Sequence, residues 1–430
     1  MLDIKIIREN PELVKENIKK KFQNQKLPLV DEILKKDSEW RKAKFEADNL
    51  RKERNIVSEG INQAKKAKDN KKAEELIKKA KEIPEEIAKL EQKEELLRDE
   101  IKELMLTIPN IMSKHVPIGK DETENKVIKK AGKIPKFNFP IKTHVELAEF
   151  LEIADFEKAA KVSGKGFYYL KNELALLNQA LIRFAIDFMR KKDYTYIETP
   201  LMLNVKSVFA SMDKAAIEQS VYSIKNEDLS LIGTAEQSLL AMHAEDVIEE
   251  VVLPKKYFSY SMCFRKEVGA HGINEKGLWR THQFNKIEQF IFCKPEESEK
   301  LYDELLKNSE EILKLLELPY RIIEICSGDL ADWKHRSADL EVWRPTTKEY
   351  GEIMSLSNCT DYQARKLDIK CIDKHGARRV LHTLNNTALA TSRIMVALLE
   401  NNQQKDGSIK IPKVLWKYTG FKEIKAKKKI

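Results

Sequence analysis

The sequence contains little cysteine. Its 430 residues include five cysteines, and none of them forms a C-x-x-C pair. An odd and scattered set of this kind is typical of reduced thiols in a cytosolic protein. A structural zinc site requires closely spaced pairs of cysteine or histidine ligands. We therefore expect no zinc and a cytoplasmic location.

Long apolar runs are also absent. No segment approaches the ~20 consecutive apolar residues that a membrane-spanning helix requires. The first residues show no apolar stretch of the kind that signal peptides carry. The sequence therefore predicts a soluble protein with no membrane partner.

The excess of positive charge is small. Lysine and arginine number 78 against 69 acidic side chains, which gives a net charge of +9, and charged residues make up 34% of the chain. This balance permits an RNA partner without requiring one. A chain of this length suggests two or three domains and can bury a large core.

Residues 1–108 are predicted to form a helical arm. Asn10 can cap a short entry helix with Pro11 at its first position. From about Asp31, apolar residues recur three or four positions apart along two charged segments, and the residues from Gly60 to Asn70 permit a reversal. The apolar positions are Ile33, Trp40, Ala43, Ala47, Leu50, Val57 and Ile61, then Leu76, Ile83, Ile87, Leu90, Leu97, Ile101 and Leu104. The pattern predicts an antiparallel two-helix coiled coil, roughly 50 Å long at 1.5 Å per residue.

Two features qualify this arm. Pro84 lies inside the second segment, where it should kink the helix or start a new segment. Lys36, Arg54 and Glu94 interrupt the apolar seams. By itself the pattern fits a dimerising coiled coil or a solvated spacer as well as contact with a large partner.

Residues 109–170 are predicted to be a connector and the start of a second domain. Prolines and glycines recur between Thr107 and Lys142, which indicates extended and turn conformations. A helix is expected from about Glu173, followed by a strand that ends at Pro200. The apolar residues that share one face of this helix are Leu174, Leu177, Leu181, Phe184 and Phe188.

An alternating pattern near the middle of the chain predicts a β-hairpin. Residues 258–267 alternate, so Arg265 and Glu267 point to the same side. A glycine-containing loop from Val268 to Trp279 follows. The second run places on one face Arg280, His282, Phe284, Lys286 and Glu288. Such a surface can hold nucleotide phosphates and stack a base, although cross-strand Arg/Glu pairs on a solvated sheet produce the same pattern.

These residues resemble a known motif. Phe264-Arg265-Lys266-Glu267 and, after the loop, Arg280-Thr281-His282-Gln283-Phe284 resemble motif 2 of class II aminoacyl-tRNA synthetases, in the form of the seryl-tRNA synthetase family. The helix and strand that end at Pro200 resemble motif 1, which builds the dimer interface in that class. The resemblance implies a homodimer through the region from Phe184 to Pro200, and a loop that acts as a mobile lid over ATP.

Three further segments extend the resemblance. Thr234-Ala235-Glu236 opens a predicted helix, where Thr234 and Gln237 can form an ordinary capping box, and in the family a T-A-E triplet here contacts the amino acid. Glu352-Ile353-Met354-Ser355, expected near a strand end, occupies the family's ATP and metal position, and oxygen ligands suit Mg²⁺. The run from Leu381 to Arg393 resembles motif 3. The general class II pattern has glycines where this chain has Thr387, Ala388 and Ala390, and seryl enzymes use the residue at Thr387 for serine.

The resemblance implies an α+β protein. An N-terminal antiparallel two-helix coiled-coil arm that binds tRNA (1–108) precedes residues 109–170, a class II catalytic core (171–420) on a mostly antiparallel β-sheet flanked by helices, and a basic tail (421–430). The implied reaction is activation of L-serine with ATP and Mg²⁺, followed by transfer to tRNA(Ser). The sequence leaves open whether tRNA(Sec) is also charged.

The resemblance also implies roles for individual residues. Arg265 and Arg393 are the implied catalytic residues, through the α- and γ-phosphates of ATP. The implied ATP-binding residues are Arg265, Lys266, Glu267, Thr281, Phe284, Glu352, Ile353, Met354, Ser355 and Arg393. The implied serine-binding residues are Thr234, Ala235, Glu236, Arg265, Glu288 and Thr387. Glu352 and Ser355 would hold Mg²⁺.

Four other classes of protein fit the sequence less well. A tRNA-binding module without catalysis would lack a working set of Arg265, Glu267 and Arg393. A relative that charges carrier proteins would lack the arm, and a coiled-coil structural protein would leave the C-terminal two-thirds unexplained. A prolyl or threonyl enzyme would share motifs 2 and 3 without the arm joined to T-A-E.

Overall fold

The computed structural model describes residues 1–268 and 276–425. The chain divides into two compact units, Leu2–Pro109 and Asn110–Ile430, and Met1 groups with the second. Most of the predicted lid falls on residues 269–275, and the end of the basic tail falls on residues 426–430. These parts of the lid and of the tail therefore lie outside the described residues.

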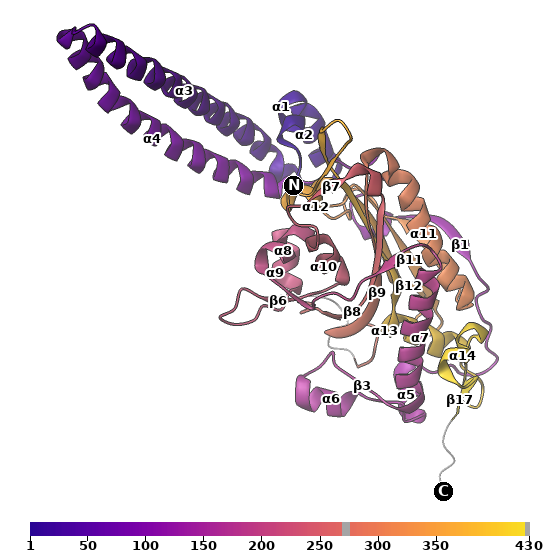
Figure 1. The fold of residues 1–430 in the computed structure, drawn as a ribbon. Helices are drawn as coiled ribbons and strands as arrows, with labels where there is room; N and C mark the ends of the chain where they lie inside the picture. The colour runs from indigo at the N-terminus through magenta and orange to yellow at the C-terminus, as the bar shows by residue number, and fades with distance from the viewer. Residues whose placement is uncertain (269–275, 426–430) are drawn as a thin grey trace. The chain divides into compact units, whose positions relative to one another are not determined.

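The first unit consists of helices (Figure 1). They are α1 (Ile4–Glu9), α2 (Pro11–Lys20), α3 (Leu27–Lys66) and α4 (Asn70–Thr107), with a 3-10 turn at Asn24–Lys26. Figure 1 shows α3 and α4 running side by side and joined by a tight turn at one end. The predicted two-helix arm is confirmed, and the entry helix is capped as expected, because the Asn10 side chain accepts a hydrogen bond from the Leu13 amide at 3.1 Å.

The reversal between the two long helices falls at residues 67–69, inside the range from Gly60 to Asn70 that the sequence predicted. Helix α3 continues through Gly60 to Lys66. The missing side chain at Gly60 leaves room for α4, since a Cβ atom there would meet Leu76 Cδ1 at 3.1 Å. Pro84 does not start a new segment, since α4 is continuous from Asn70 to Thr107. Proline removes one helical hydrogen bond, and packing of the neighbouring Ile83 and Ile87 against α3 offsets that loss.

Apolar and charged contacts hold the two long helices together. Val57 of α3 packs with Ile83 and Ile87 of α4 in a small buried cluster. Ion pairs also cross the hairpin, from Lys36 to Glu100 at 2.8 Å and from Arg51 to Glu91 at 2.7 Å. Exposed pairs of this kind contribute little, so the apolar seam carries most of the arm's stability.

Substitution of one seam residue should loosen the arm. Ile83 is 3% exposed, and truncation of a buried isoleucine to alanine costs about 2–5 kcal/mol. We expect Ile83→Ala to lower the opening free energy of α3 and α4 by about that amount in native-state hydrogen exchange. Ile56→Ala is the matched control, because Ile56 is 69% exposed and should change protection by less than about 0.5 kcal/mol. Equal loss of protection in both variants would contradict this account.

The second unit is built on an eight-stranded sheet (Figure 1). In spatial order its strands are β1 (Lys126–Ala131), β10 (Tyr320–Glu324), β11 (Arg336–Arg344), β12 (Glu349–Thr360), β15 (His382–Ala390), β9 (Gln283–Cys293), β8 (Lys255–Phe264) and β4 (Thr195–Tyr196). All neighbours pair antiparallel except β4 and β8. The predicted fold class is confirmed. The segment expected to be a connector supplies the edge strand β1, which the sequence did not predict.

Shorter strands and helices surround the main sheet. The strands are β2 (Ala154–Asp155), β3 (Tyr169–Leu170), β5 (Met202–Leu203), β6 (Ser230–Leu231), β7 (Val247–Glu249), β13 (Lys370–Ile372), β14 (Arg378–Val380), β16 (Ile409–Lys410) and β17 (Glu423–Ile424). The helices are α5 (His144–Phe150), α6 (Phe156–Ser163), α7 (Asn172–Arg190), α8 (Val205–Ser211), α9 (Lys214–Ser220), α10 (Ala235–Ala241), α11 (Ser298–Leu315), α12 (Tyr362–Lys366), α13 (Thr391–Asn402) and α14 (Trp416–Thr419).

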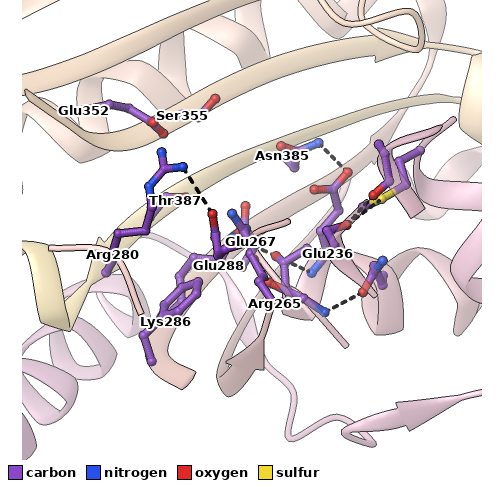
Figure 2. Close-up of a pocket in the computed structure, with 18 of the residues that line it drawn as sticks. Glu236, Arg265, Glu267, Arg280, Lys286, Glu288, Glu352, Ser355, Asn385 and Thr387 are labelled. Atoms are coloured by element: carbon purple, nitrogen blue, oxygen red, sulfur yellow. Dashed lines mark hydrogen bonds and ion pairs between the residues drawn. The ribbon is translucent and has the colours of Figure 1, made fainter. Parts of the chain in front are cut away.

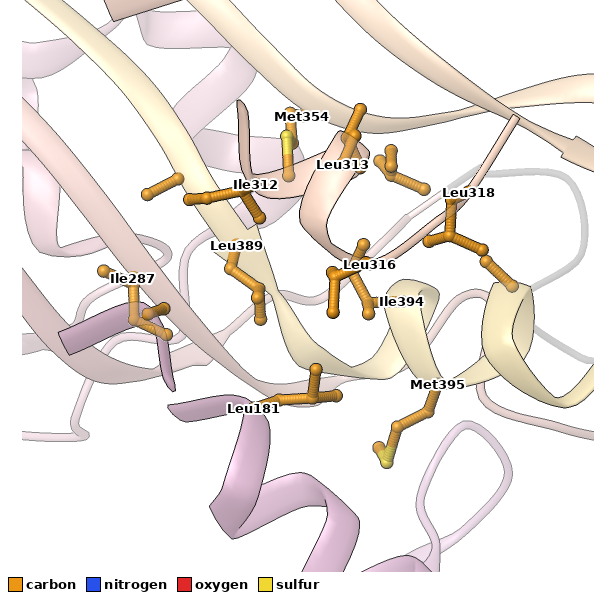
Figure 3. Close-up of a cluster of buried hydrophobic side chains, with 14 of the residues drawn as sticks. Leu181, Ile287, Ile312, Leu313, Leu316, Leu318, Met354, Leu389, Ile394 and Met395 are labelled. Atoms are coloured by element: carbon orange, nitrogen blue, oxygen red, sulfur yellow. The ribbon is translucent and has the colours of Figure 1, made fainter. Parts of the chain in front are cut away.

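Alternation along β9 separates the core from the opposite face of the sheet. Ile287 points into a large apolar core with residues of α7, α11 and α13 (Figure 3). Figure 3 shows Leu181, Leu316 and Ile394 gathered in the same cluster. The helix expected from Glu173 is confirmed as α7, whose predicted apolar face is buried. The side chains of β9 between the core positions are therefore free to form a site on the other face.

Two expectations about the whole chain can be compared with the structure. All five cysteines are free thiols, as the sequence predicted, and the structure buries all five. Among the described helices, none combines the length and the apolar character that crossing a bilayer requires.

Candidate active site

A pocket of about 610 Å³ opens on the face of the sheet opposite the core (Figure 2). The structure brings most of the predicted site residues to its walls. They are Thr234, Glu236, Arg265, Glu267, Thr281, Phe284, Glu288, Glu352, Ile353, Ser355, Thr387 and Arg393. Segments separated by up to 160 residues therefore meet in one cavity, as their order along the chain had suggested.

Three predicted site residues in the described chain do not line this pocket. Met354 lies on β12 directly after an irregularity in the β11–β12 register at Ile353, and its side chain is buried in the core. Ala235 is fully buried at the start of α10. Lys266 lies between Arg265 and Glu267, and its backbone amide donates to the Ser220 carbonyl at 2.9 Å.

The predicted hairpin is confirmed as β8 and β9. The two strands pair antiparallel with Cys263 opposite Phe284, and Arg265 follows the end of β8. The Arg265 guanidinium lies 5.3 Å from the centre of the Phe284 ring, and its Nε donates to the Gly233 carbonyl at 3.2 Å. A cation and an aromatic face are thus held together at the same wall of the pocket.

The T-A-E segment joins helix capping to the pocket. The Thr234 hydroxyl accepts a hydrogen bond from the Glu236 amide at 3.2 Å and donates to Glu288 Oε2 at 3.1 Å. The cap is confirmed, but the predicted capping box is not formed in the expected way. The Gln237 side chain accepts instead from the Gly233 amide at 2.8 Å. Thr234 therefore caps α10 and also lines the pocket, and the sequence had allowed both roles.

Glu236 is partly buried and lies among amide donors. Its Oε1 accepts hydrogen bonds from Gln363 Nε2 at 2.8 Å and from Asn385 Nδ2 at 2.9 Å. Burial, reinforced by the negative charge of Glu288, raises the pKa of Glu236 to about 7. A carboxylate that is costly to ionise in this position favours a bound cation, because a cation would stabilise its charged form.

A second group of carboxylates lies on the strands β11 and β12. The sequence suggested that Glu352 and Ser355 lie near the end of a strand. In the structure they lie inside β12. Arg393 Nη1 donates to the Glu352 carboxylate at 3.1 Å and to its carbonyl at 2.8 Å. Burial opposes ionisation of Glu352, but the charge of Arg393 outweighs it and lowers the Glu352 pKa.

Asp339 adds an unsatisfied oxygen beside this group. It lies opposite Ser355 in the β11–β12 register, and its Oδ1 is buried without a hydrogen-bond partner among the described residues. Burial and the charge of Glu352 raise the Asp339 pKa to about 7. Two acidic side chains, one of which has a buried and unpartnered oxygen, and a hydroxyl fit a hard divalent cation.

Trp279 contacts two arginines, Arg344 and Arg393, at this end of the pocket. Its ring lies 4.2 Å from the Arg344 guanidinium and 5.5 Å from that of Arg393. Its carbonyl accepts from Arg393 Nε at 3.2 Å. Gly351 leaves room for the ring, since a Cβ atom there would meet Trp279 Cζ2 at 2.3 Å.

Sequence reasoning assigned no role to several residues of this pocket. Lys286 and Arg280 were placed on the alternating face, and both line the cavity. Trp279 lies within two residues of motif 2, yet nothing in its spacing indicated a contact with Arg393. Asn385 and Gln363 carry no local signal, because each acts through a contact with Glu236, more than 100 residues away in the sequence.

Comparison with known families agrees with this geometry. Residues 220–402 match the family described as the tRNA synthetase class II core domain (G, H, P, S and T), and residues 1–112 match the seryl-tRNA synthetase N-terminal domain. The sheet and the pocket are thus those of a class II aminoacyl-tRNA synthetase.

Individual relatives narrow the assignment. The chain is 45% identical to a serine–tRNA ligase of Methanocella arvoryzae over 420 residues, which are 97% of this chain and 98% of the relative. It resembles the crystal structure of seryl-tRNA synthetase from Pyrococcus horikoshii complexed with ATP, with a TM-score of 0.95, 43% identity and full coverage of both chains. It also resembles cytoplasmic serine–tRNA ligase from Naegleria fowleri in complex with AMP, with a TM-score of 0.89, 32% identity and coverage of 100% and 99%. The chain belongs to the seryl-tRNA synthetase family.

The contact between Gly351 and Trp279 can be tested by a double-mutant cycle. We expect Gly351→Ala to destabilise the protein by about 1–3 kcal/mol, because the added methyl group overlaps the indole. In a Trp279→Ala background the same substitution should cost less than about 0.5 kcal/mol. Unfolding by denaturant measures both values.

Gly233→Ala is the matched control, since a Cβ atom at Gly233 meets its nearest neighbours at an ordinary 3.6 Å. An equal cost of Gly351→Ala in both backgrounds would exclude the proposed clash.

Proposed function

We propose that this chain activates L-serine with ATP and transfers the seryl group to the 3′ end of tRNA(Ser). The observation that carries the proposal is a single pocket that joins two kinds of site. Arg265, Phe284 and Arg393 suit a nucleotide, and Glu236 and Glu288 suit a small polar cation with a hydroxyl. The relatives named serine–tRNA ligase, and the ATP and AMP complexes among them, support the same reading.

ATP would lie along the wall formed by motifs 2 and 3. Its base stacks on Phe284, Glu267 lies near the adenine amino group, and Arg265 meets the α-phosphate. Arg393 meets the terminal phosphate and is held toward it by the Trp279 carbonyl. Guanidinium groups suit this role because their planar donors bind phosphate oxygens in pairs.

A magnesium ion would be held by Glu352 and Ser355. The buried, unpartnered Oδ1 of Asp339 next to Ser355 fits this assignment, since such an oxygen is stabilised by a nearby cation. When bound, the ion would offset the negative charge of the ATP phosphates. Arg393 would share that task, because its guanidinium lies beside Glu352, to which it donates a hydrogen bond at 3.1 Å.

Serine would occupy the end of the pocket beside α10. Glu236 accepts hydrogen bonds from its ammonium group, Arg265 attracts its carboxylate, and Glu288 accepts a hydrogen bond from its hydroxyl. Thr234 and Thr387 lie beside them. Thr387 lies directly opposite Glu288 in the β15–β9 register. A site built to bond a hydroxyl rejects an analogue without it by about 10⁴–10⁵, which is the selectivity needed against alanine.

The chemistry requires positioning more than a catalytic acid or base. The serine carboxylate oxygen attacks the α-phosphorus, its bond to phosphorus forms as the bond to pyrophosphate breaks, and seryl-adenylate remains. A ribose hydroxyl at the tRNA 3′ end then attacks the carbonyl carbon and releases AMP. Arg265 stabilises charge on the α-phosphate in the first step.

The helical arm would supply RNA binding. Its length exceeds what packing of a domain on itself requires, and the family match to residues 1–112 supports a role common to these enzymes. We further propose a cytoplasmic homodimer that forms through the region from Phe184 to Pro200. The same active site would charge tRNA(Sec) where that tRNA shares the features that the arm contacts.

Serine-dependent exchange of pyrophosphate into ATP tests the first step. We expect exchange with serine and not with alanine, threonine or cysteine. Arg265→Ala should lower its rate by about 10²–10³-fold, because one donor to the developing charge is lost. Arg378→Ala is the control, since Arg378 is exposed on β14 and lies outside the pocket. Normal exchange by Arg265→Ala, or exchange with another amino acid alone, would refute the assignment.

Shortening the arm tests the division of labour. Replacement of residues 52–90 by a short Gly-Ser linker removes the far half of the hairpin and keeps the Arg51–Glu91 ion pair at the new tip. We expect unchanged pyrophosphate exchange and a loss of tRNA charging of about 10²–10⁴-fold at subsaturating tRNA, because a second binding site is lost. An equal loss of both activities would show that the arm does not act separately.

A further inference from the structure

Lys286 is a buried lysine inside the pocket with no role in the proposed reaction. It lies on β9 between Phe284 and Glu288, and its side chain is 8% exposed. Its ammonium group forms an ion pair with the Glu288 carboxylate, whose side chain is 1% exposed (Figure 2). Lysine is rarely buried to this extent unless it is paired.

Stability alone does not explain this ion pair. Removing two charges from water is costly, and a buried pair is often no more stable than apolar residues of the same volume. The neighbouring positions in the sheet are Ser261 on β8 and Ala390 on β15, which are small. An apolar residue at position 286 would therefore fit the fold, and the lysine requires another explanation.

The contacts of Glu288 indicate what the lysine does. Glu288 Oε2 accepts a hydrogen bond from the Thr234 hydroxyl at 3.1 Å and also takes the contact with Lys286 Nζ. The other oxygen, Oε1, has no hydrogen-bond partner in the part of the chain that the structure describes. Two donors on one oxygen fix the rotation of the carboxylate, and the second oxygen is left for a ligand.

The positive charge also acts on Glu236. The charged groups that face this carboxylate are Glu288 and Lys286 of β9 and Lys334 before β11, and the thiol of Cys359 on β12 lies nearby. The neutral amides of Gln363 and Asn385 complete its surroundings. Both Lys286 and Lys334 lower the Glu236 pKa against burial and the charge of Glu288.

We propose that Lys286 is a positioning residue of the amino-acid site, which holds Glu288 with one oxygen free for the substrate hydroxyl. This inference rests on the proposed function, because it assigns the two carboxylates to serine. It predicts an effect on serine binding and none on ATP binding.

Three substitutions separate charge from hydrogen bonding. Lys286→Met removes both, Lys286→Gln keeps a donor without the charge, and Lys286→Arg keeps the charge. In pyrophosphate exchange we expect Lys286→Met to raise the KM for serine roughly 10²-fold, since removing one partner of a buried pair leaves the other charge uncompensated. The KM for ATP should not change. Lys286→Gln should recover part of the loss and Lys286→Arg most of it.

The pH profile provides a readout that a structural role would not change. Protonated Glu236 does not attract the ammonium group, so the KM for serine should rise below about pH 7 in the unaltered protein. Loss of the positive charge at position 286 raises the Glu236 pKa. The inflection should therefore move upward by about one pH unit in Lys286→Met and Lys286→Gln, but not in Lys286→Arg.

Lys256→Met is the matched control. Lys256 lies on β8, pairs with Glu304 at 2.8 Å and is outside the pocket. It should leave the KM for serine and the inflection unchanged, even where the melting temperature falls. Circular dichroism and ATP binding establish that each variant is folded.

The outcomes distinguish a failure of the Lys286 inference from a failure of the proposed function. A folded Lys286→Met variant with the KM and pH profile of the unaltered protein would overturn the inference and leave the proposed function intact. So would a Lys286→Arg variant as impaired as Lys286→Met. Absence of serine-dependent exchange in the unaltered protein would instead refute the proposed function itself.

Discussion

The alternation of side chains along β9 is the constraint on which the rest of the catalytic unit depends. Ile287 points into the core beneath α7, α11 and α13, and its neighbours Lys286 and Glu288 point into the pocket. A shift by one residue would exchange the two sets and bury charges in the core. Because β9 pairs with β8 and β15 on either side, one register positions motif 2, motif 3 and the amino-acid end of the pocket together.

Charge pairing is the second organising feature of the pocket. Arg393 contacts Glu352, Arg280 contacts Glu267 at 3.4 Å, and Lys286 contacts Glu288. Each cation thus lies beside a carboxylate that has its own proposed ligand. These ligands are Mg²⁺ for Glu352, the adenine amino group for Glu267 and the serine hydroxyl for Glu288. Of these pairs only Lys286–Glu288 is buried, and neither buried nor partly exposed pairs contribute much net stability. Their value here lies in orientation: a ligand that brings both signs of charge meets groups that are already in place.

The local patterns were predictable because their causes are local. The hairpin alternation, the Asn10 and Thr234 caps and the apolar face of α7 follow from spacing within a few residues. The missed features depend on other parts of the chain. Gly60 lies inside α3, where its missing side chain leaves room for Leu76 of α4. The strand β1 forms from a proline-rich connector only because β10 offers it a free edge.

The sequence by itself determined the order of the motifs, the two-helix arm and the residue types that a nucleotide and an amino acid require. Tertiary structure decided how those residues behave. Burial and the charge of Glu288 raise the pKa of Glu236, and the Glu288 carboxylate is contacted by Thr234 and Lys286. Desolvation and hydrogen-bond geometry exist only once the sheet has assembled, because they depend on which distant side chains exclude water from the same cavity.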